Sequence, residues 1–347
     1  MPDTRPGMLF EDGLCQGCLY EAKKENIDWD ARWIELEEFI YNNPSTGMYD
    51  CVIAVSGGKD SYYQTHIFKE KLGLNPLLVC VDDGFTKTRT GIYNLKNMAE
   101  EFDCDLFIYK MKPKTQKAII RYTFEEYGRP CYIIHRLIYT VPIWVGIQFY
   151  IPIVVYGENI AVVRGLKDNR DIPTAWNQVN NSVASGISLS KIAYECGLDM
   201  QELEMTMVPD DSAKKITTPI YLSYFIRWDG YENYQFALTR GFKTLEGEWN
   251  RLGGHMNYTG IDSYGYLISS VLKYAKYDHS YVTDLACELI RGKHIDKIFG
   301  MELIDEHEGV INNLILGDFC TTLGYSEKEF YEIFNKYYRE GIHNERE

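Results

Sequence analysis

The sequence lacks an uninterrupted apolar run long enough to cross a membrane. Its longest apolar stretch, residues 137–155, is broken by two prolines and by Gly146 and Gln148, whereas a spanning helix needs about 20 predominantly apolar residues. Residues 1–13 also lack the charged and apolar regions of a secretion signal. These absences predict a cytoplasmic protein without a membrane partner.

Basic residues are in deficit, and the cysteines do not suggest a disulfide framework. The 36 Lys and Arg residues face 50 Asp and Glu residues, and the net charge of −14 repels phosphate backbones, so no nucleic-acid partner is expected. The nine cysteines are scattered apart from Cys15 and Cys18, which favours reduced thiols. What is present is ordinary globular composition, with 45% hydrophobic and 25% charged residues.

Three segments differ in their pattern along the 347 residues, a length that allows roughly two domains. Residues 1–45 contain the Cys-x-x-Cys pair and a helical spacing over 29–40. Residues 46–176 alternate strands and helices, and residues 177–347 are mostly helical. In the last segment the clearest helical signals are the spacing over 188–205 and 261–276 and a capping box at 326–329.

The middle segment predicts an α/β fold. Strands are expected at 51–55, 76–82, 105–109 and 151–156. Helices are expected at 60–72, 88–102, 114–127 and 132–149. Such alternation predicts a parallel sheet with helices on both faces, and ligands of these sheets bind at the carboxyl ends of the strands.

The strongest motif is the hexapeptide Ser56-Gly57-Gly58-Lys59-Asp60-Ser61. It follows the first strand, which ends at Val55, and precedes a helix. Two glycines let successive backbone N–H groups face one point, and the helix adds its positive end. With the charge of Lys59, the loop predicts a cradle for phosphate or pyrophosphate, and Asp60 is explained if a magnesium ion bridges the phosphates.

Other polar residues lie at the same predicted edge of the sheet. Asp82 and Asp83 follow the second strand, where contacts with adenine and ribose are expected, although a plain polar turn is the alternative. Gly157 and Glu158 close the strand at 151–156. Glu158 is a candidate for binding magnesium or orienting a substrate, and a solvated glutamate at a strand end is the alternative.

The hexapeptide does not have the spacing of a Walker A loop, which needs four residues between its first Gly and its Gly-Lys. It resembles instead the PP-loop of ATP pyrophosphatases. The resemblance implies a PP-loop fold of the kind found in adenine nucleotide alpha hydrolases (HUP-like). It also implies that the loop holds the β- and γ-phosphates as one leaving group while a substrate oxygen attacks the α-phosphorus.

Flanking stretches narrow the resemblance to the N-acetyl sugar amidotransferases of surface-polysaccharide and nonulosonic-acid pathways. The similar stretches span nearly the whole chain: 1–7, 13–18, 27–32, 75–79, 142–149, 156–159, 241–245 and 283–292. Pathways of this family include lipopolysaccharide biosynthesis and the pseudaminic and legionaminic acids of flagellin glycosylation.

This resemblance implies an enzyme that uses ATP and Mg²⁺ to convert an acetamido group into an acetamidino group, with release of AMP and pyrophosphate. The substrate would be an N-acetylated sugar or nucleotide-sugar, and ammonia would come from a separate glutaminase subunit. Lys59, Asp60 and Glu158 are the residues to which catalysis is assigned on this basis.

Candidates for the substrate side lie in the later part of the chain. The aromatic stretch 221–229 is expected to line a sugar pocket. Cys131 and His135 share a helix face, either as a thiol–base pair or as a packed cysteine beside a substrate-facing histidine. Arg136 and the charged run 167–170 either grip acidic groups or are solvated. The substrate-side residues selected are His135, Arg136, Asn159, Tyr224 and Trp228.

The resemblance also bears on Cys15 and Cys18. Related sequences carry another Cys-x-x-Cys just ahead of the stretch at 1–7, and four thiolates would form a zinc site. This chain begins within the resemblance, so zinc binding here would need ligands from elsewhere, such as Cys131, His135 or His66.

Two other functions are compatible with the loop. A PP-loop enzyme that adenylylates a tRNA base for thiolation or amination predicts a basic patch and paired catalytic cysteines. A non-catalytic ATP-binding module predicts a degraded loop, whereas the hexapeptide is intact.

Overall fold

The structure is a computed structural model that describes residues 1–4, 8–163, 171–176, 186–251 and 254–338. The charged run 167–170, a candidate from the sequence, lies outside the described residues. A five-stranded sheet forms the centre of the protein, and its strands are all parallel. Their spatial order is β5 (Asp105–Lys110), β4 (Pro76–Asp82), β3 (Cys51–Ala54), β6 (Ile153–Tyr156) and β7 (Thr218–Tyr221).

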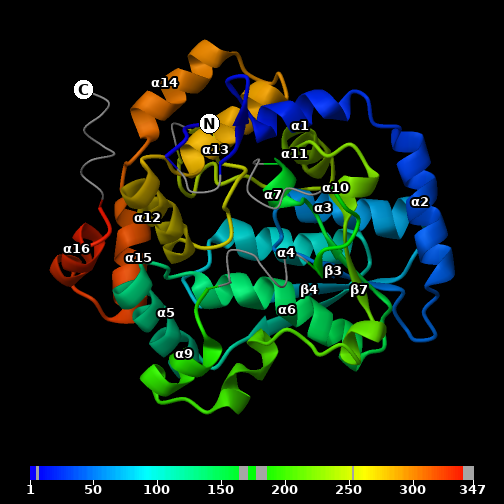
Figure 1. Ribbon diagram of the computed structural model, residues 1–347, viewed down its shortest axis with the longest axis horizontal. Coiled ribbons are helices and arrows are strands. Elements are labelled where there is room, and N and C mark those ends of the chain that lie inside the picture. The colour runs from blue at the N-terminus through cyan, green and yellow to red at the C-terminus, as the bar shows by residue number, and fades with distance from the viewer. Residues whose placement is uncertain (5–7, 164–170, 177–185, 252–253, 339–347) are drawn as a thin grey trace.

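Helices cover both faces of this sheet, so the predicted α/β fold class is confirmed. In Figure 1, α3 and α4 lie on one side of the strands and α6 on the other, and α6 packs against β3, β4 and β6. Strands β3 and β6 are almost fully buried, as expected of strands enclosed on two faces. The helices of this part are α3 (Lys59–His66), continued by the π-helical turn η1 (Ile67–Lys71), α4 (Arg89–Glu101), α5 (Pro113–Tyr127) and α6 (Tyr132–Gln148).

The fifth strand was not expected from the sequence. Strand β7 has only four residues and contains Pro219, which removes one backbone donor and weakens a strand signal. It lies at the edge of the sheet beside β6, a position where proline is tolerated, and a single antiparallel bridge joins Ile220 to Thr174 on its other side. The sheet is therefore built from residues on both sides of position 176.

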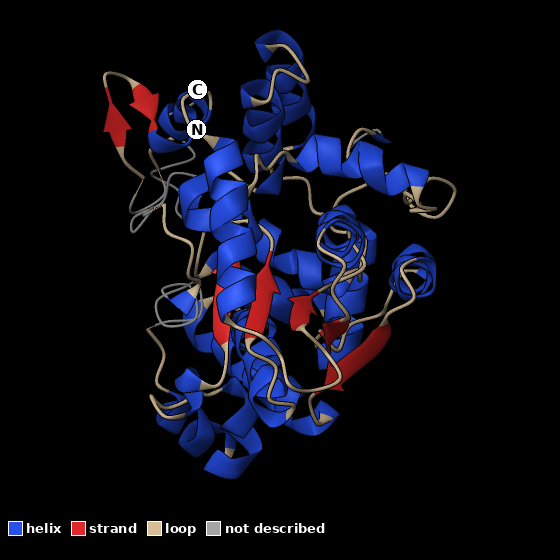
Figure 2. Cartoon of the chain, turned by 90° about the vertical axis from the view of Figure 1, so that its right-hand side faces the viewer, coloured by secondary structure: helices blue, strands red, loops and turns tan. Residues whose placement is uncertain are grey.

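The N-terminal segment forms a hairpin and two helices. Figure 2 shows the hairpin, β1 (Phe10–Glu11) and β2 (Leu14–Cys15), apart from the main sheet. Helix α1 (Gln16–Lys24) follows it directly and was not predicted, whereas α2 (Trp29–Asn42) lies where the spacing predicted a helix.

The later part of the chain is mostly helical, as predicted. The helix expected over 188–205 is broken at Gly197, which adopts a left-handed φ of 63°, and the one expected over 261–276 begins only near 265. The elements here are α7 (Ile160–Val163), α9 (Leu189–Cys196), η2 (Met200–Thr206), η3 (Ala213–Lys215), α10 (Leu222–Phe225), α11 (Gly230–Thr239), η5 (Gly265–Leu267), α12 (Ile268–Tyr277), α13 (Tyr281–Arg291), α14 (Lys297–His307), α15 (Asn313–Leu323) and α16 (Glu327–Asn335). The capping box of Ser326 opens α16 as expected.

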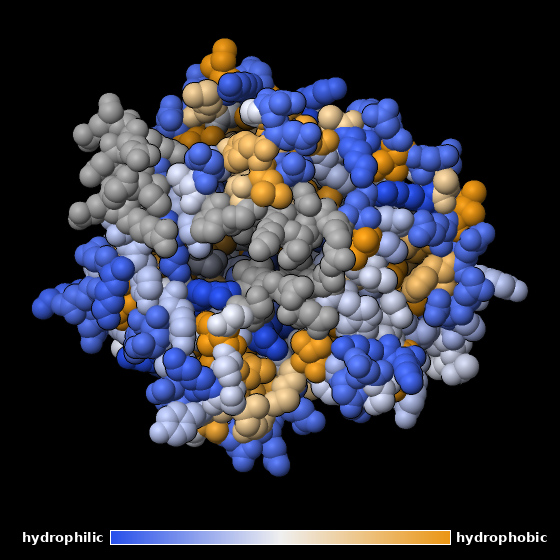
Figure 3. Space-filling model, in the orientation of Figure 1, coloured by the Kyte–Doolittle hydropathy of each residue, from blue (hydrophilic) through white to orange (hydrophobic). Residues whose placement is uncertain are grey.

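The larger of two hydrophobic clusters among the described residues runs through the protein. It joins residues of all three segments, including Leu36, Ile53 and Phe319. Among the described residues, no helix is both long and apolar enough to span a bilayer. On the face in Figure 3, hydrophilic and hydrophobic residues are interspersed.

The strand order creates a crevice at one edge of the sheet. The chain leaves β3 toward β4 on one side, whereas β6, which follows β5 in the chain, pairs with β3 on the other side. Connections that diverge in this way open a space at the carboxyl ends of the two central strands, where ligands of such sheets bind. The hexapeptide and Glu158 follow these two strands.

Candidate nucleotide and acceptor site

The hexapeptide forms a tight turn that only glycine permits at its second position. Gly57 has a φ of 87°, and a Cβ there would lie 2.9 Å from the Cα and the backbone N of Leu95 on α4. The turn is braced by its two serines, since Ser61 Oγ accepts from Ser56 N (3.0 Å) and Ser56 Oγ accepts from Gly58 N (3.2 Å). The loop is thus pre-shaped.

The turn places the N-terminus of α3 at the crevice. Gly58 is the N-cap residue and provides no side-chain cap, so the first N–H groups of the helix are available to an anion. This arrangement, together with the side chains of Lys59 and Asp60, fits the phosphates of ATP and an accompanying magnesium ion. Lys59 and the helix end would hold the phosphates, and Asp60 would hold the metal, which would neutralise negative charge there.

Lys59 and Asp60 form an ion pair with a Nζ–Oδ2 distance of 2.6 Å. The Lys59 side chain is only 13% exposed. Burial alone would lower its pKa, but the Asp60 carboxylate outweighs burial and raises the pKa, so Lys59 stays charged. Asp60 also accepts a hydrogen bond from Asn233 Nδ2 on α11 (2.8 Å).

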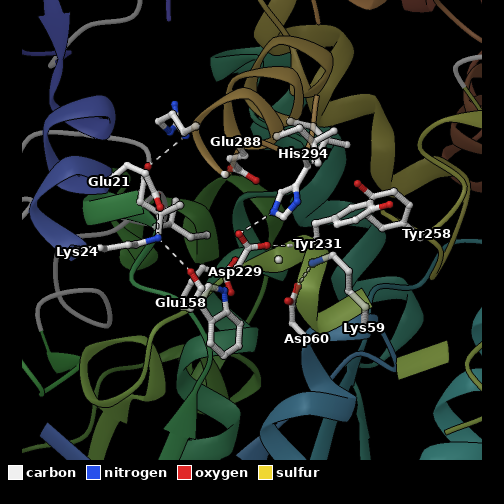
Figure 4. A pocket seen from close by; sticks show the side chains of 18 of the residues that line it. Glu21, Lys24, Lys59, Asp60, Glu158, Asp229, Tyr231, Tyr258, Glu288 and His294 are labelled. Atoms are coloured by element: carbon white, nitrogen blue, oxygen red, sulfur yellow. Dashed lines mark hydrogen bonds and ion pairs between the residues drawn. The ribbon is translucent and has the colours of Figure 1, made fainter. Parts of the chain in front are cut away.

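A pocket opens beside this ion pair (Figure 4). Its wall combines residues of α1, the loop and α3, the end of β6, α11 and α13. The lining includes Glu21, Lys24, Lys59, Asp60, Glu158, Trp228, Asp229, Tyr231, Tyr258, Tyr281, Glu288, Arg291 and His294. The structure therefore brings the three predicted catalytic residues, Lys59, Asp60 and Glu158, to one pocket.

Two features of the pocket wall have a packing explanation. A Cβ on Gly157 would lie 2.9 Å from Gln64 Nε2 and 3.0 Å from the Trp228 ring, so glycine lets the tryptophan close one side. Lys24 Nζ donates to the Trp228 carbonyl (3.0 Å). The N-terminal segment thereby becomes part of the pocket, a contribution that the sequence did not reveal.

Asp82 and Asp83 lie at the end of β4 and have protein partners. Asp82 accepts from Gly84 N (2.8 Å), and Lys110 lies 3.1 Å from its other oxygen. Asp83 is buried and accepts from Ser263 Oγ (2.7 Å). Asp83 therefore ties the C-terminal segment to the sheet, and the expected contacts with adenine and ribose stay a prediction.

The five substrate-side candidates do not gather at one place. Trp228 lines the pocket. Tyr224, four residues earlier, lies against α2, where the Arg32 guanidinium stacks 4.1 Å from its ring centre. Asn159 is buried, and its backbone N donates to Ser223 Oγ.

The remaining two candidates are on α6. Arg136 donates from Nε to the Thr206 carbonyl (3.0 Å). His135 lies 3.0 Å from the Tyr266 hydroxyl, and its neighbour Cys131 is buried, with a pKa raised by burial. A raised thiol pKa disfavours the thiolate that a thiol–base pair would need.

His135 makes stability depend on pH. Burial and the nearby Arg129 charge lower its pKa to about 4, below the ordinary value of about 6.5. The unfolded chain therefore binds the proton first, and the stabilisation present above about pH 6.5 is lost as the pH falls toward 4. Thermal melts should show that wild type loses about 2 kcal/mol more than His135→Gln between pH 7.5 and pH 5.

The difference in stability loss between wild type and His135→Gln isolates the contribution of His135. Asp262, whose pKa burial raises to about 6, titrates in the same range with the opposite effect, but it is common to both. Equal losses in wild type and variant would contradict the prediction.

Cys15 and Cys18 lie at the start of α1 with their sulfur atoms 3.5 Å apart and are free thiols. Burial raises the pKa of Cys15, but hydrogen bonds from Cys18 lower it more, so the net shift is downward. Within the described part of the chain, no third His, Cys, Asp or Glu joins them in a group that could hold a metal ion. Neither Cys131, His135 nor His66 supplies the missing zinc ligands.

Sequence reasoning missed Asp229 and His294 as a pair. Asp229 Oδ2 lies 2.8 Å from His294 Nε2, and both line the pocket. Asp229 is also the N-cap of α11, so an Asp-Gly start of a helix was the available signal. The histidine had none.

Comparison with known sequences gives two partial matches. Residues 246–346 match the family described as LPS biosynthesis protein WbpG-like, C-terminal domain, which is less than a third of this chain. A stretch of 96 residues is 41% identical to the uncharacterized protein MJ1599 of Methanocaldococcus jannaschii. That match covers 27% of this chain and 34% of the relative, so the chain spans about a third of its length.

Three of the solved structures that align with this chain share little sequence identity with it. The NH3-dependent NAD synthetase of Campylobacter jejuni is 10% identical, with a TM-score of 0.31 over 68% of this chain and 94% of that one. The NMN synthetase of Francisella tularensis is 13% identical, with a TM-score of 0.31 over 61% of this chain and 87% of that one. The U34-tRNA thiolase NcsA of Methanococcus maripaludis is 14% identical, with a TM-score of 0.32 over 85% of this chain and 88% of that one.

Proposed function

We propose that this protein is an ATP-dependent amidotransferase that converts an acetamido group of a sugar into an acetamidino group. An amide carbonyl is a poor electrophile, because its oxygen is a poor leaving group. Transfer of AMP to that oxygen makes it a good one, and ammonia then replaces it. The reaction releases pyrophosphate in the first step and AMP in the second.

One observation carries this proposal. The pocket joins Lys59 and Asp60 of the phosphate-cradling loop to α13, which belongs to the segment that matches a domain named for lipopolysaccharide biosynthesis. The loop is suited to holding pyrophosphate, and the pocket wall opposite it belongs to the segment that resembles a lipopolysaccharide-biosynthesis domain. Together they support a reaction in which ATP activates a sugar. The resemblance of the flanking motifs to N-acetyl sugar amidotransferases supports the same reaction.

The residues at the pocket have distinct tasks in this proposal. Lys59 and the N-terminus of α3 would hold the leaving pyrophosphate, and Asp60 would hold a magnesium ion, which would offset the charge of the pyrophosphate. Glu158 orients the acceptor from the end of β6. Trp228 offers an aromatic surface to the sugar, and a separate glutaminase subunit supplies ammonia.

The products of a single incubation test the proposal. The protein is mixed with ATP, Mg²⁺, ammonium and a panel of N-acetylated sugars and nucleotide-sugars. We expect AMP and pyrophosphate in equal amounts, and a sugar product lighter by about one mass unit because NH replaces oxygen. Formation of ADP, or a changed tRNA with no changed sugar in a parallel reaction, would contradict it.

A further inference from the structure

A histidine faces the pocket from the C-terminal segment. His294 follows α13, its side chain is 18% exposed, and its ring packs against that of Tyr231, tilted by 34° with ring centres 4.6 Å apart. Figure 4 shows it above Asp229, with Lys59 and Asp60 on the other side of that carboxylate. The resemblance to N-acetyl sugar amidotransferases gave His294 no role.

Asp229 fixes the imidazole in one orientation. Asp229 Oδ1 accepts from the backbone N of Tyr231 (2.8 Å) and of Glu232 (3.0 Å), which leaves Oδ2 to the histidine. Burial alone would raise the pKa of Asp229, but the hydrogen bond from His294 lowers it more, so the carboxylate is ionised.

This arrangement determines which ring nitrogen carries the proton. An ionised carboxylate accepts hydrogen bonds and donates none, so the neutral imidazole carries its proton on Nε2 and its lone pair on Nδ1. Within the described part of the chain, Nδ1 has no hydrogen-bond partner. The lone pair on Nδ1 is therefore not engaged by a described protein group, and His294 lines the pocket.

The start of α11 links this histidine to the loop. Next to Asp229, Gly230 gives room to Lys59, since a Cβ there would lie 3.1 Å from Nζ. One turn later Asn233 holds Asp60 at 2.8 Å. The base and the phosphate-binding loop are thus positioned by one helix turn.

We infer that His294 is the proton acceptor of the amination step, with Asp229 as its positioning residue; this inference rests on the proposed function. Ammonia forms a bond from its nitrogen to the carbon of the adenylylated acetamido group, and the π pair of that group's carbon–nitrogen double bond moves onto the sugar nitrogen. The new nitrogen is then an ammonium, and one of its protons passes to Nδ1 of His294. The bond between carbon and the AMP oxygen breaks, AMP leaves with the electron pair, and the carbon–nitrogen bond becomes that of an amidinium.

The step needs such a base. While the added nitrogen carries three protons, the adduct reverts by losing neutral ammonia. Removal of one proton makes that nitrogen a poor leaving group, and AMP departs instead. A positioned base typically contributes 10²–10⁴-fold to such proton transfers.

The test separates the two half-reactions in His294→Gln. Adenylylation is followed by exchange of labelled pyrophosphate into ATP, which depends on the sugar and needs no ammonia. Amination is followed by mass of the sugar product. We expect exchange to stay within about threefold of wild type and product formation to fall about a hundred-fold. His255→Gln, an exposed histidine outside the pocket, should change neither.

Two further variants guard against a structural effect. Asp229→Asn keeps an oxygen for the cap of α11 but removes the negative charge, and should show the same selective loss. In His294→Ala, added imidazole should restore product formation without changing exchange. Parallel loss of both half-reactions, or unchanged product formation in His294→Gln, would overturn the inference. If none of the acetamido sugars supports pyrophosphate exchange by the wild-type protein, that result would instead overturn the proposed function on which the inference rests.

Discussion

Replacing Lys59 with methionine is expected to lower sugar-dependent release of pyrophosphate about a thousand-fold. Methionine has a similar length but carries no charge. The leaving pyrophosphate gains negative charge as its bond to the α-phosphorus breaks, and Lys59 faces it from a position where water is largely excluded, since the side chain is 13% exposed. A charge fixed in such a place is worth about 4 kcal/mol to the transition state.

Pyrophosphate release under saturating ATP and sugar measures this effect. The matched control is Lys96→Met, because the Lys96 side chain is 76% exposed and pairs loosely with Glu100 at 3.7 Å. It should keep wild-type activity. A Lys59→Met protein that melts normally and retains more than a tenth of the activity would show that the loop does not bind the leaving group.

Replacing Gly57 with alanine is expected to cost about 3 kcal/mol of folding stability and to abolish activity. A φ of 87° strains any residue with a Cβ, and here the added carbon would also lie 2.9 Å from the backbone of Leu95. Backbone atoms of a packed helix cannot move aside as a flexible side chain can. Either the loop opens or α4 shifts, and both would move the N–H groups away from the phosphate position.

The variant Gly73→Ala, followed in a thermal or urea melt, separates the cost of the positive φ from the cost of the contact with Leu95. Gly73 also has a positive φ, 68°, but a Cβ there meets no atom within 4 Å. It should lose only the conformational part, about 1 kcal/mol. Equal losses in the two variants would mean that contact with Leu95 is unimportant.

Strands and the loop were predictable because their signals are local. Strands β3, β4 and β6 are enclosed on both faces, so they appear in the sequence as apolar runs, and the observed strands lie within about two residues of the predicted ones. The hexapeptide lies between such a run and a helix, and six adjacent residues define it. The carboxyl-end rule then placed Glu158 near the loop without any knowledge of side chains.

What escaped prediction depends on contacts between distant residues. Asp229 and His294 are 65 positions apart, and neither has a spacing that distinguishes it from a helix cap or a surface histidine. Tyr224 and Trp228 belong to one aromatic stretch, yet the first lies against α2 and the second lines the pocket. The short helix α10 and the residues that join it to α11 decide which ring faces inward, and a residue pattern does not encode that path of the chain.

The pairing of β7 with β6 has a consequence for synthesis of the protein. Residues 218–221 leave the ribosome long after β6, so β6 keeps one edge of unpaired N–H and C=O groups during that interval. The sheet, and with it the crevice beside Glu158, closes only when the later segment arrives. Nascent chains paused before that point would expose this unpaired edge, a template on which another chain could pair.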